Sequence, residues 1–316
     1  MTATAPASDL PREAGVDRRP LAWWASILIG IAAAAAGLLP WLVTGLRLPL
    51  QYLWDAQTAP ESMPLALLPF SQYALTQLFG LIVVGSAAAG IAARATRSRL
   101  TRGGFGLLTL GVLAMQVVAI AQSALVVGAG LQQRRESLLY LGALTAVCVL
   151  SFLIGVAALL LIARAPRAGA LIGLTAGAIA AGPWVGGFFQ PLLATGSDGL
   201  YVIVGLIQWV APVLVGVAIA WTGVNTVGRV VAAVVGLTLL WIAPAAMTGI
   251  SNAAGSRVLA RYPLEMIDYG VSVFGMALFM PEIALRPIVA AVVVAAVGLI
   301  ARWAWGRARR ERATAA

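Results

Sequence analysis

The 316-residue chain contains no histidine, no lysine and a single cysteine, Cys148. Without histidine, and with one cysteine, it lacks the usual ligands of haem, zinc and copper sites. Without lysine, it contains no phosphate-binding loop of the G-x-x-x-x-G-K type. We therefore expect no metal, no cofactor and no catalytic residue of these classes, and we interpret Cys148 as a small packing residue.

Charged residues are also scarce. They make up 10% of the chain, whereas 61% of its residues are hydrophobic and the mean hydropathy is +0.95. A soluble domain carries roughly a quarter charged residues. Here apolar runs of about twenty residues recur, the length that crosses a bilayer as a helix. The composition excludes a soluble globular domain and predicts an all-α, polytopic membrane bundle.

Eight apolar runs define the predicted spans of a single transmembrane domain over residues 21–305. They cover residues 21–43, 73–95, 104–130, 137–163, 168–194, 200–222, 228–249 and 283–305. Two long outer loops, 44–72 and 250–282, separate some of these spans. We expect residues 1–20 to form a disordered cytoplasmic tail and residues 306–316 to form a basic cytoplasmic tail.

Arginine is distributed unevenly between the two ends of these spans. If both termini are cytoplasmic, 15 of the 21 basic residues, all arginine, fall on the inner side. Arginine in short loops is retained in the cytoplasm, so this bias predicts an N-in, C-in topology. The net charge of +10 is thus explained by topology, and nucleic acid is excluded as a partner. The expected location is the inner (cytoplasmic) membrane of a bacterium.

The apolar stretch 269–281 leaves the number of crossings open. Its length of about thirteen residues suits a re-entrant or interfacial segment better than a span, although an extension back through Glu265 could just cross. A ninth crossing would place the arginine-rich C-terminus outside. We therefore prefer eight spans, with residues 264–282 lying on or dipping into the outer leaflet.

Short strings recur four spans apart. Residues 38–43 in the first span resemble residues 181–186 in the fifth, and residues 106–110 in the third resemble residues 236–240 in the seventh. These matches suggest a 4 + 4 parallel repeat, whose halves are related by an axis along the membrane normal. Chance similarity is the alternative in a chain so rich in alanine, glycine and leucine.

The fifth predicted span contains the string GPWVGGFFQP over residues 182–191. Two prolines and three glycines should kink or break the helix and free carbonyl groups that need partners. One interpretation is a discontinuous helix lining a substrate cavity. The other is an ordinary proline kink near a helix end. The candidate substrate-binding residues are Pro183, Trp184, Gln190, Gln208, Trp209, Pro40 and Trp41.

Four charged residues gather in the second outer loop, namely Arg257, Arg261, Glu265 and Asp268. Their spacing places them on one face if the segment is helical. A surface ion-pair network is the simpler interpretation, and contact with a lipid headgroup or a partner protein is the alternative. No Asp, Glu or Arg lies in the middle third of a predicted span, which disfavours ion-coupled uptake through an intramembrane carboxylate.

Two functional hypotheses follow from these patterns. The first is a permease-like or transport-associated protein that handles an amphipathic or uncharged solute at a cavity near the broken fifth helix. Besides the lipid bilayer, its candidate partners are other membrane subunits or an ATPase acting in trans. The second is a non-catalytic scaffold or assembly subunit that docks a partner through both outer loops. An enzyme acting through Glu265 or Asp268 is disfavoured, because the chain offers neither residue a His or Lys partner of tunable pKa.

Overall fold

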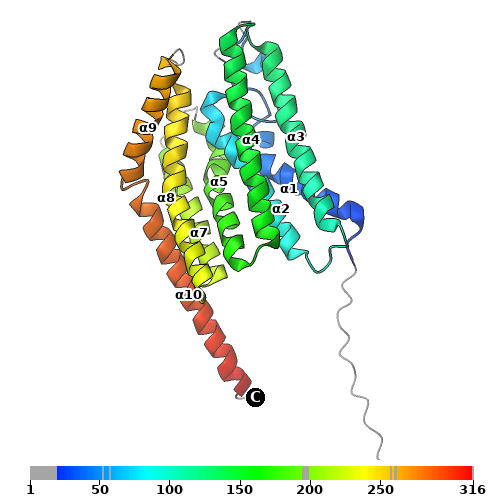
Figure 1. Cartoon of the computed structure of the whole chain (residues 1–316), viewed down its shortest axis with the longest axis vertical. Helices are drawn as coiled ribbons and strands as arrows, with labels where there is room; N and C mark the ends of the chain where they lie inside the picture. Colours follow the sequence, from blue (N-terminus) through cyan, green and yellow to red (C-terminus); the bar gives the residue numbers. More distant parts are fainter. Residues whose placement is uncertain are drawn as a thin grey trace, which may run out of the picture.

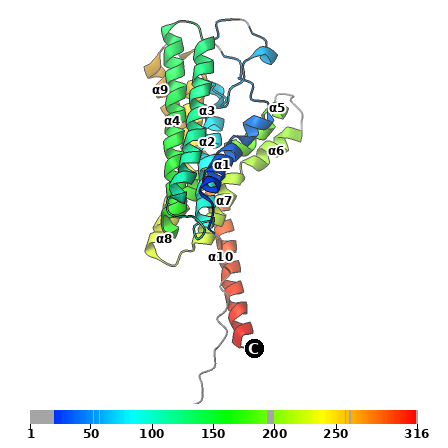
Figure 2. The same cartoon turned by 90° about the vertical axis from the view of Figure 1, so that its right-hand side faces the viewer.

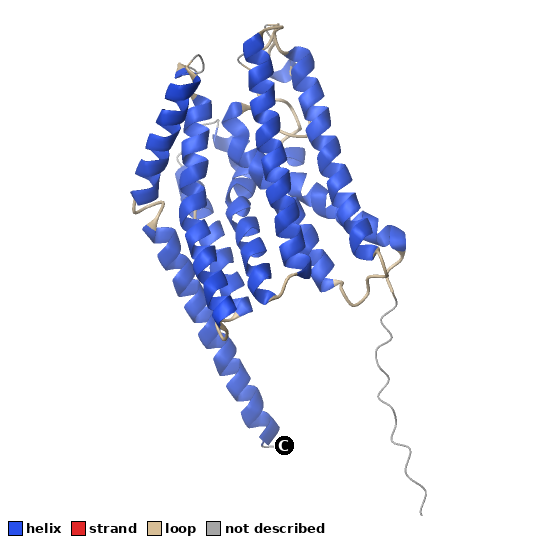
Figure 3. Cartoon of the chain, in the orientation of Figure 1, coloured by secondary structure: helices blue, strands red, loops and turns tan. Residues whose placement is uncertain are grey.

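The computed structural model describes residues 20–51, 53–56, 58–193, 199–256, 258–259 and 262–314, and within these ranges it is helical and has no strand (Figures 1 and 3). The elements are α1 Trp23–Val43, η1 Pro60–Ser62, η2 Gln72–Ala74, α2 Leu75–Ala95, α3 Gly104–Gly130, α4 Arg135–Arg164, α5 Arg167–Leu193, α6 Gly199–Ile207, α7 Val210–Thr222, α8 Val227–Gly255, α9 Pro263–Phe279 and α10 Leu285–Thr314. Eight segments of the described chain are long and apolar enough to cross a membrane. The all-α membrane bundle is thus confirmed.

Helix α1 begins and helix α10 ends at the same end of the bundle, which we call the terminal end (Figure 1). The backbone N–H of Leu21 donates to the carbonyl of Arg99, in the short connection between α2 and α3. Arg94 closes the same end, because its guanidinium donates to the carbonyls of Ile162 and Ala165 at the end of α4. Such contacts satisfy carbonyls that a helix C-terminus leaves unpaired.

The bundle has two halves. Helices α1 to α4 pack on one another in the first half, and α5, α7, α8, α9 and α10 form the second. Helix α5 also packs on α2 and α4, so it provides most of the contact between the halves, and Figure 1 shows it between α4 and α8. Separate buried cores follow this division: one cluster joins α5, α7, α8 and α10, and two others lie within the first half.

Small residues allow the closest helix crossings. Gly37 of α1 lies against Gly85 of α2, where a Cβ atom added to Gly37 would lie 2.5 Å from the carbonyl oxygen of Leu81 and 2.6 Å from the Cα atom of Gly85. No larger side chain fits at this distance. Close approach of small residues provides the packing that membrane helices rely on in place of a hydrophobic driving force.

Residues 44–72 fold over the opposite, distal end of the first half (Figure 2). Leu68 and Phe70 of this segment are fully buried. The Gln51 amide donates to the carbonyl of Phe70 (3.1 Å), and its oxygen accepts from the hydroxyl of Tyr140 in α4 (2.6 Å). The sequence predicts a long outer loop here, and in the structure it is a packed cap. We call residues 44–72 the cap.

The second predicted outer loop, 250–282, is mostly helical. Helix α8 continues to Gly255, and α9 begins at Pro263. A proline suits the first turn of a helix, because its missing N–H would have no intrahelical partner there. The loop is shorter than the sequence predicts because the polar residues that follow the apolar run, up to Gly255, continue helix α8.

Helix α9 follows α8 from the distal end to about half of its length (Figure 1). The indole N–H of Trp241, in the middle of α8, donates to the carbonyl of Leu278 near the end of α9 (2.7 Å). Helix α10 then begins at Leu285 and continues in the same direction toward the terminal end (Figure 1). The sequence predicts that residues 264–282 lie on or dip into the outer leaflet; in the structure most of them form α9, and the last candidate span is α10.

Candidate functional site

The fifth helix is continuous. Helix α5 runs unbroken from Arg167 to Leu193 through Pro183, so the prediction of a broken fifth helix is wrong. Of the three glycines in this string, Gly187 serves packing, because a Cβ atom there would lie 2.9 Å from the Gln77 amide nitrogen and 3.0 Å from Pro40. A proline removes one backbone hydrogen bond, and the close neighbours of α5 hold the helix in place.

The structure brings together predicted residues from the first and fifth spans. The indole N–H of Trp184 donates to the carbonyl of Gly37 (2.8 Å), and that of Trp41 donates to the carbonyl of Ala66 in the cap (2.8 Å). Pro40 is buried in the same crossing. Buried tryptophan needs such a partner for its N–H. These residues brace α1 against α5 and the cap, and they line neither of the cavities described below.

Three further predicted residues lie at the surface of the bundle. Gln190 of α5 is exposed, as are Gln208 and Trp209, which separate α6 from α7. Pro212 explains this interruption, because a proline cannot donate to the carbonyl four residues earlier and its ring displaces that carbonyl. The Gln208 amide donates locally to the carbonyl of Gly205 (2.7 Å).

A second break in helical structure separates α9 from α10. Pro281 lies in the turn that separates them, and Glu282 pairs there with Arg286 at 3.3 Å. Both side chains are more than half exposed. Helical breaks thus occur within the sixth span and before the last span, α10, rather than in the fifth span. The prolines at 212 and 281 were the sequence signal for them.

The structure describes two of the four charged residues predicted in the second outer loop. Glu265 and Asp268 are exposed on the first turns of α9. Arg257 and Arg261 lie outside the described residues. The proposed contact of these four residues with a headgroup or a partner therefore stays a prediction.

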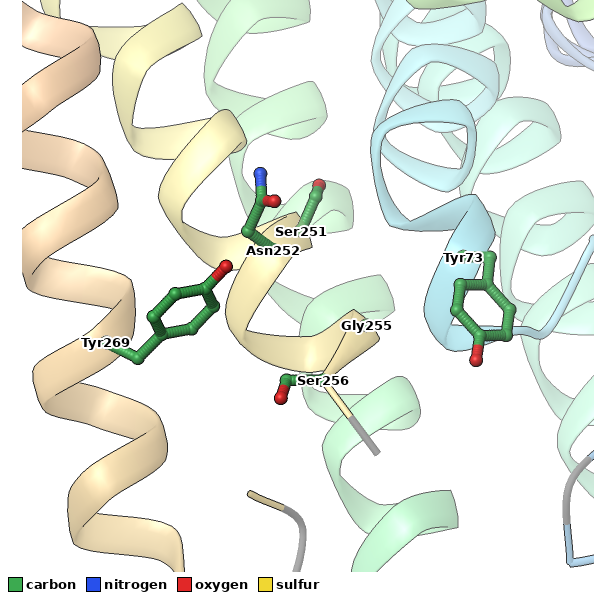
Figure 4. Close-up of a pocket in the computed structure, with 6 residues that line it drawn as sticks. All are labelled: Tyr73, Ser251, Asn252, Gly255, Ser256 and Tyr269. Atoms are coloured by element: carbon green, nitrogen blue, oxygen red, sulfur yellow. The ribbon is translucent and has the colours of Figure 1, made fainter. Parts of the chain in front are cut away.

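A polar cavity of about 430 Å³ opens at the distal end, between η2, the end of α8 and the adjacent part of α9 (Figure 4). We call it the polar pocket. Figure 4 shows the Tyr269 side chain directed from α9 toward Asn252 on α8. The residues that line it are Tyr73, Ser251, Asn252, Gly255, Ser256 and Tyr269.

An apolar cavity of about 440 Å³, the apolar groove, lies next to it between α4 and α8, with α2 and α5 as its floor. Its lining includes Phe79, Leu150, Ile154, Ile179, Ala243 and Met247. Ser251 lines both cavities, so the polar pocket lies at the distal end of the apolar groove. The groove exists because α4 and α8 each pack on α5 without packing closely on each other.

Sequence reasoning missed both cavities. The polar pocket had a signal in the string SNAAGS over residues 251–256, which follows directly after an apolar run. The groove had none, because apolar side chains that line a groove cannot be told from those that face lipid. No protein-family model, curated protein or solved structure matches the chain. The functional proposal therefore rests on the geometry of the two cavities.

Proposed function

We propose that this multi-pass membrane protein is permease-like and takes an amphipathic molecule from the bilayer into the cleft between its two halves. The observation that carries the proposal is the junction of the polar pocket and the apolar groove at Ser251. A polar headgroup would bind in the pocket while an alkyl tail lies in the groove. A soluble polar solute would not fit the groove, because its polar groups would find few hydrogen-bond partners on the apolar walls.

The length of the groove fits one lipid tail. Along α8 its lining extends from Leu239 to Ser251, which at 1.5 Å per residue is about 18 Å. The hydrocarbon core of a bilayer is about 30 Å thick, so one leaflet contributes about half of that. The groove therefore matches a tail that reaches from the headgroup level to the middle of the membrane.

The pairing of the helices supports the suggested 4 + 4 repeat. In the first half, α1 packs on α2 and α3, and α2 packs on α4. In the second half, α5 packs on α7 and α8, and α7 packs on α10, which are the corresponding spans. Transporters built from repeats bind their substrates at the repeat interface. The proposed site lies at this interface, between α4 of one half and α8 of the other.

The predicted N-in, C-in topology gives the proposed uptake a direction. In that orientation the polar pocket opens toward the outer leaflet, because it lies at the end of the bundle opposite the chain termini (Figure 1). No charged side chain of the described residues lines the groove. Energy for transport would therefore come from a partner, such as an ATPase in trans.

A photoreactive phospholipid with a diazirine in its acyl chain tests the site in nanodiscs. We expect it to label α4 and α8 along the groove. Ala246→Trp, which fills the groove, should lower this labelling at least tenfold. Leu150→Trp on the opposite wall should do the same, and its half-exposed position tolerates a large side chain.

Two control variants should leave the labelling unchanged. Ile242→Trp introduces the same side chain one turn from Ala246, outside the groove lining, and Trp184→Phe removes a hydrogen bond of the α1–α5 brace. Labelling spread evenly over all lipid-facing helices, or retained in both filling variants, would contradict the proposal.

The alternative function is a scaffold that docks a partner through its outer loops. The structure has less exposed loop than the sequence predicts for this role. The cap directs Leu68 and Phe70 into the bundle, and its Gln51 bonds within the protein. The second loop is mostly the helices α8 and α9. A partner would therefore have to dock on helical surfaces rather than on long flexible loops.

A further inference from the structure

We propose that the terminal end of the bundle holds a binding site for the phosphate group of an anionic lipid, formed by Arg229 of α8 and Arg302 of α10 at the end of α7. The site lies at the end of the bundle opposite the polar pocket, and it does not depend on the proposed function. Its evidence is the convergence of arginines from different helices and the depth at which they lie.

Two guanidinium groups converge at Gly223, the residue that follows α7. The Nη1 atoms of Arg302 and Arg229 lie 3.7 and 3.9 Å from the position that a Cβ atom of Gly223 would occupy. The two nitrogen atoms are therefore within about 8 Å of each other, a gap that a phosphate group spans when it accepts a hydrogen bond of about 2.8 Å from each. The amide Oδ1 of Asn225 lies 2.9 Å from the same position, so this exposed side chain borders the site.

Both arginines have hydrogen-bond donors left for a ligand. Arg302 donates through Nη1 to the carbonyls of Ala220 and Trp221, in the last turn of α7. A guanidinium carries five N–H donors, so those on Nε and Nη2 remain. The Arg229 side chain is half-buried and has no hydrogen-bond partner within the described part of the chain. Because a partly buried charge is costly without a counter-charge, a bound anion is stabilised there.

A third arginine lies close to the same helix end. The guanidinium of Arg94, on α2, lies over the Trp221 ring, 5.3 Å from its centroid. The carbonyl of Trp221 accepts a hydrogen bond from Arg302 (2.8 Å). Trp221 thus contacts one arginine from each half of the bundle. The third positive charge strengthens the attraction of an anion to this end of the bundle.

The helix ends contribute in the same sense. Arg229 lies on the first turn of α8, where the side chain of the N-cap residue Thr226 caps no backbone N–H. The first N–H groups of a helix lack intrahelical partners, and the helix dipole places a partial positive charge there. The last carbonyls of α7 carry the opposite partial charge, but Arg302 already binds two of them. The positive end therefore remains for a phosphate.

The depth of the site favours a lipid over an acidic protein. Trp221 and Trp303, which is the neighbour of Arg302, are both exposed on membrane-spanning helices. Exposed tryptophan is typical of the membrane–water interface, where lipid headgroups lie. A soluble acidic partner would more readily reach Arg309 and Arg312, which lie about 10–15 Å further along α10. In the predicted N-in, C-in topology, the lipid belongs to the inner leaflet.

Native mass spectrometry of the purified protein in a nonionic detergent tests the site. Phosphatidylglycerol and phosphatidylcholine with identical acyl chains are titrated separately, and the fraction of protein that retains a lipid gives each affinity. We expect phosphatidylglycerol to bind at least tenfold more tightly, because the phosphate of phosphatidylcholine is neutralised by its own ammonium group. Equal affinities for the two lipids would overturn the proposal.

Two variants connect this preference to the site. Arg229→Gln removes one cation, and Asn225→Asp places a carboxylate beside both arginines in a side chain of the same size. Each should weaken phosphatidylglycerol binding at least fivefold. Arg102→Gln is the matched control, because Arg102 is an exposed arginine at the same end, in the connection between α2 and α3. Unchanged binding in both site variants, or an equal loss in the control, would contradict the site.

Three further measurements identify the occupant. Equimolar inorganic phosphate should not displace phosphatidylglycerol, and a hexaglutamate peptide should bind more weakly than the lipid. The triple variant Asp9→Asn, Glu13→Gln and Asp17→Asn removes the acidic side chains of residues 1–19 and should bind phosphatidylglycerol as the unsubstituted protein does. Displacement by phosphate, tighter binding of the peptide through Arg229, or tenfold tighter lipid binding by the triple variant would each assign the site to another anion and overturn the proposal.

Discussion

Individual glycines determine how closely the helices approach one another. At Gly37 the neighbouring backbone of α2 occupies the space of a side chain, whereas at Gly182 no atom lies within 4 Å of an added Cβ atom. Both are glycines in apolar helices, and their sequence surroundings do not distinguish them. Only the packing partner decides which glycine is required.

This difference predicts opposite responses to substitution. Gly37→Leu should reduce the free energy of unfolding by about 1–3 kcal/mol or more, because the backbone of α2 must move. Gly182→Ala should change it by at most about 1 kcal/mol, in the stabilising direction, because alanine is the better helix former. Thermal unfolding of the two purified variants in one detergent compares them. Equal losses of stability would contradict the crossing described here.

The tryptophan and proline strings of the first and fifth spans lie in a packed helix crossing. Trp184 is held by its hydrogen bond to the Gly37 carbonyl, and Pro40 is buried against α5. The sequence shows that such a tryptophan needs a partner. It does not show whether that partner is a ligand or a backbone carbonyl, so sequence alone leaves both interpretations open.

At the level of the elements, whether a proline interrupts a helix depends on the packing of that helix against other helices. Helices α1, α5 and α8 each contain a proline and stay continuous, and each packs against several other helices. Breaks separate α6 from α7 and α9 from α10, and there α6 packs chiefly on α5, and α9 on α8. Interior proline costs about 3 kcal/mol. Extensive packing offsets this cost, and sequence alone does not report the packing.

The cap provides a prediction at this scale. Gln51→Ala removes the acceptor of the Tyr140 hydroxyl and the donor to the Phe70 carbonyl, which should cost about 1–3 kcal/mol. A broad-specificity protease should then cut within residues 44–72 several times faster than in the unsubstituted protein. The exposed Glu61→Ala variant is the control, and its cleavage rate should not change. Rapid cleavage of the unsubstituted cap would show that this segment is not packed.

For the whole molecule, sequence predicted the class and the number of crossings. Eight apolar segments, with both described chain ends on one side, agree with the span count, and α3 has the predicted bounds of 104–130. The cleft was not predictable, since it depends on α4 and α8 packing on α5 rather than on each other. Hydropathy identifies a span but not its neighbours.

The orientation is testable on intact cells. In a Cys148→Ser background, single cysteines at Ser62 in the cap and at Ser98 near the terminal end occupy exposed positions on opposite sides. With N-in, C-in topology, a membrane-impermeant thiol reagent should label Ser62→Cys and not Ser98→Cys, and disruption of the membrane should make both reactive. The reverse pattern would invert the topology.

The position of α5 has a mechanical consequence. Most contact between the halves runs through this one helix, which packs on α2 and α4 of the first half and on α7 and α8 of the second. The separation of α4 and α8, the two walls of the apolar groove, is therefore set by how each of them packs on α5 and not by a contact with each other. In the proposed function, a shift of either wall on α5 would widen or narrow the opening of the groove to lipid, as in a lateral gate.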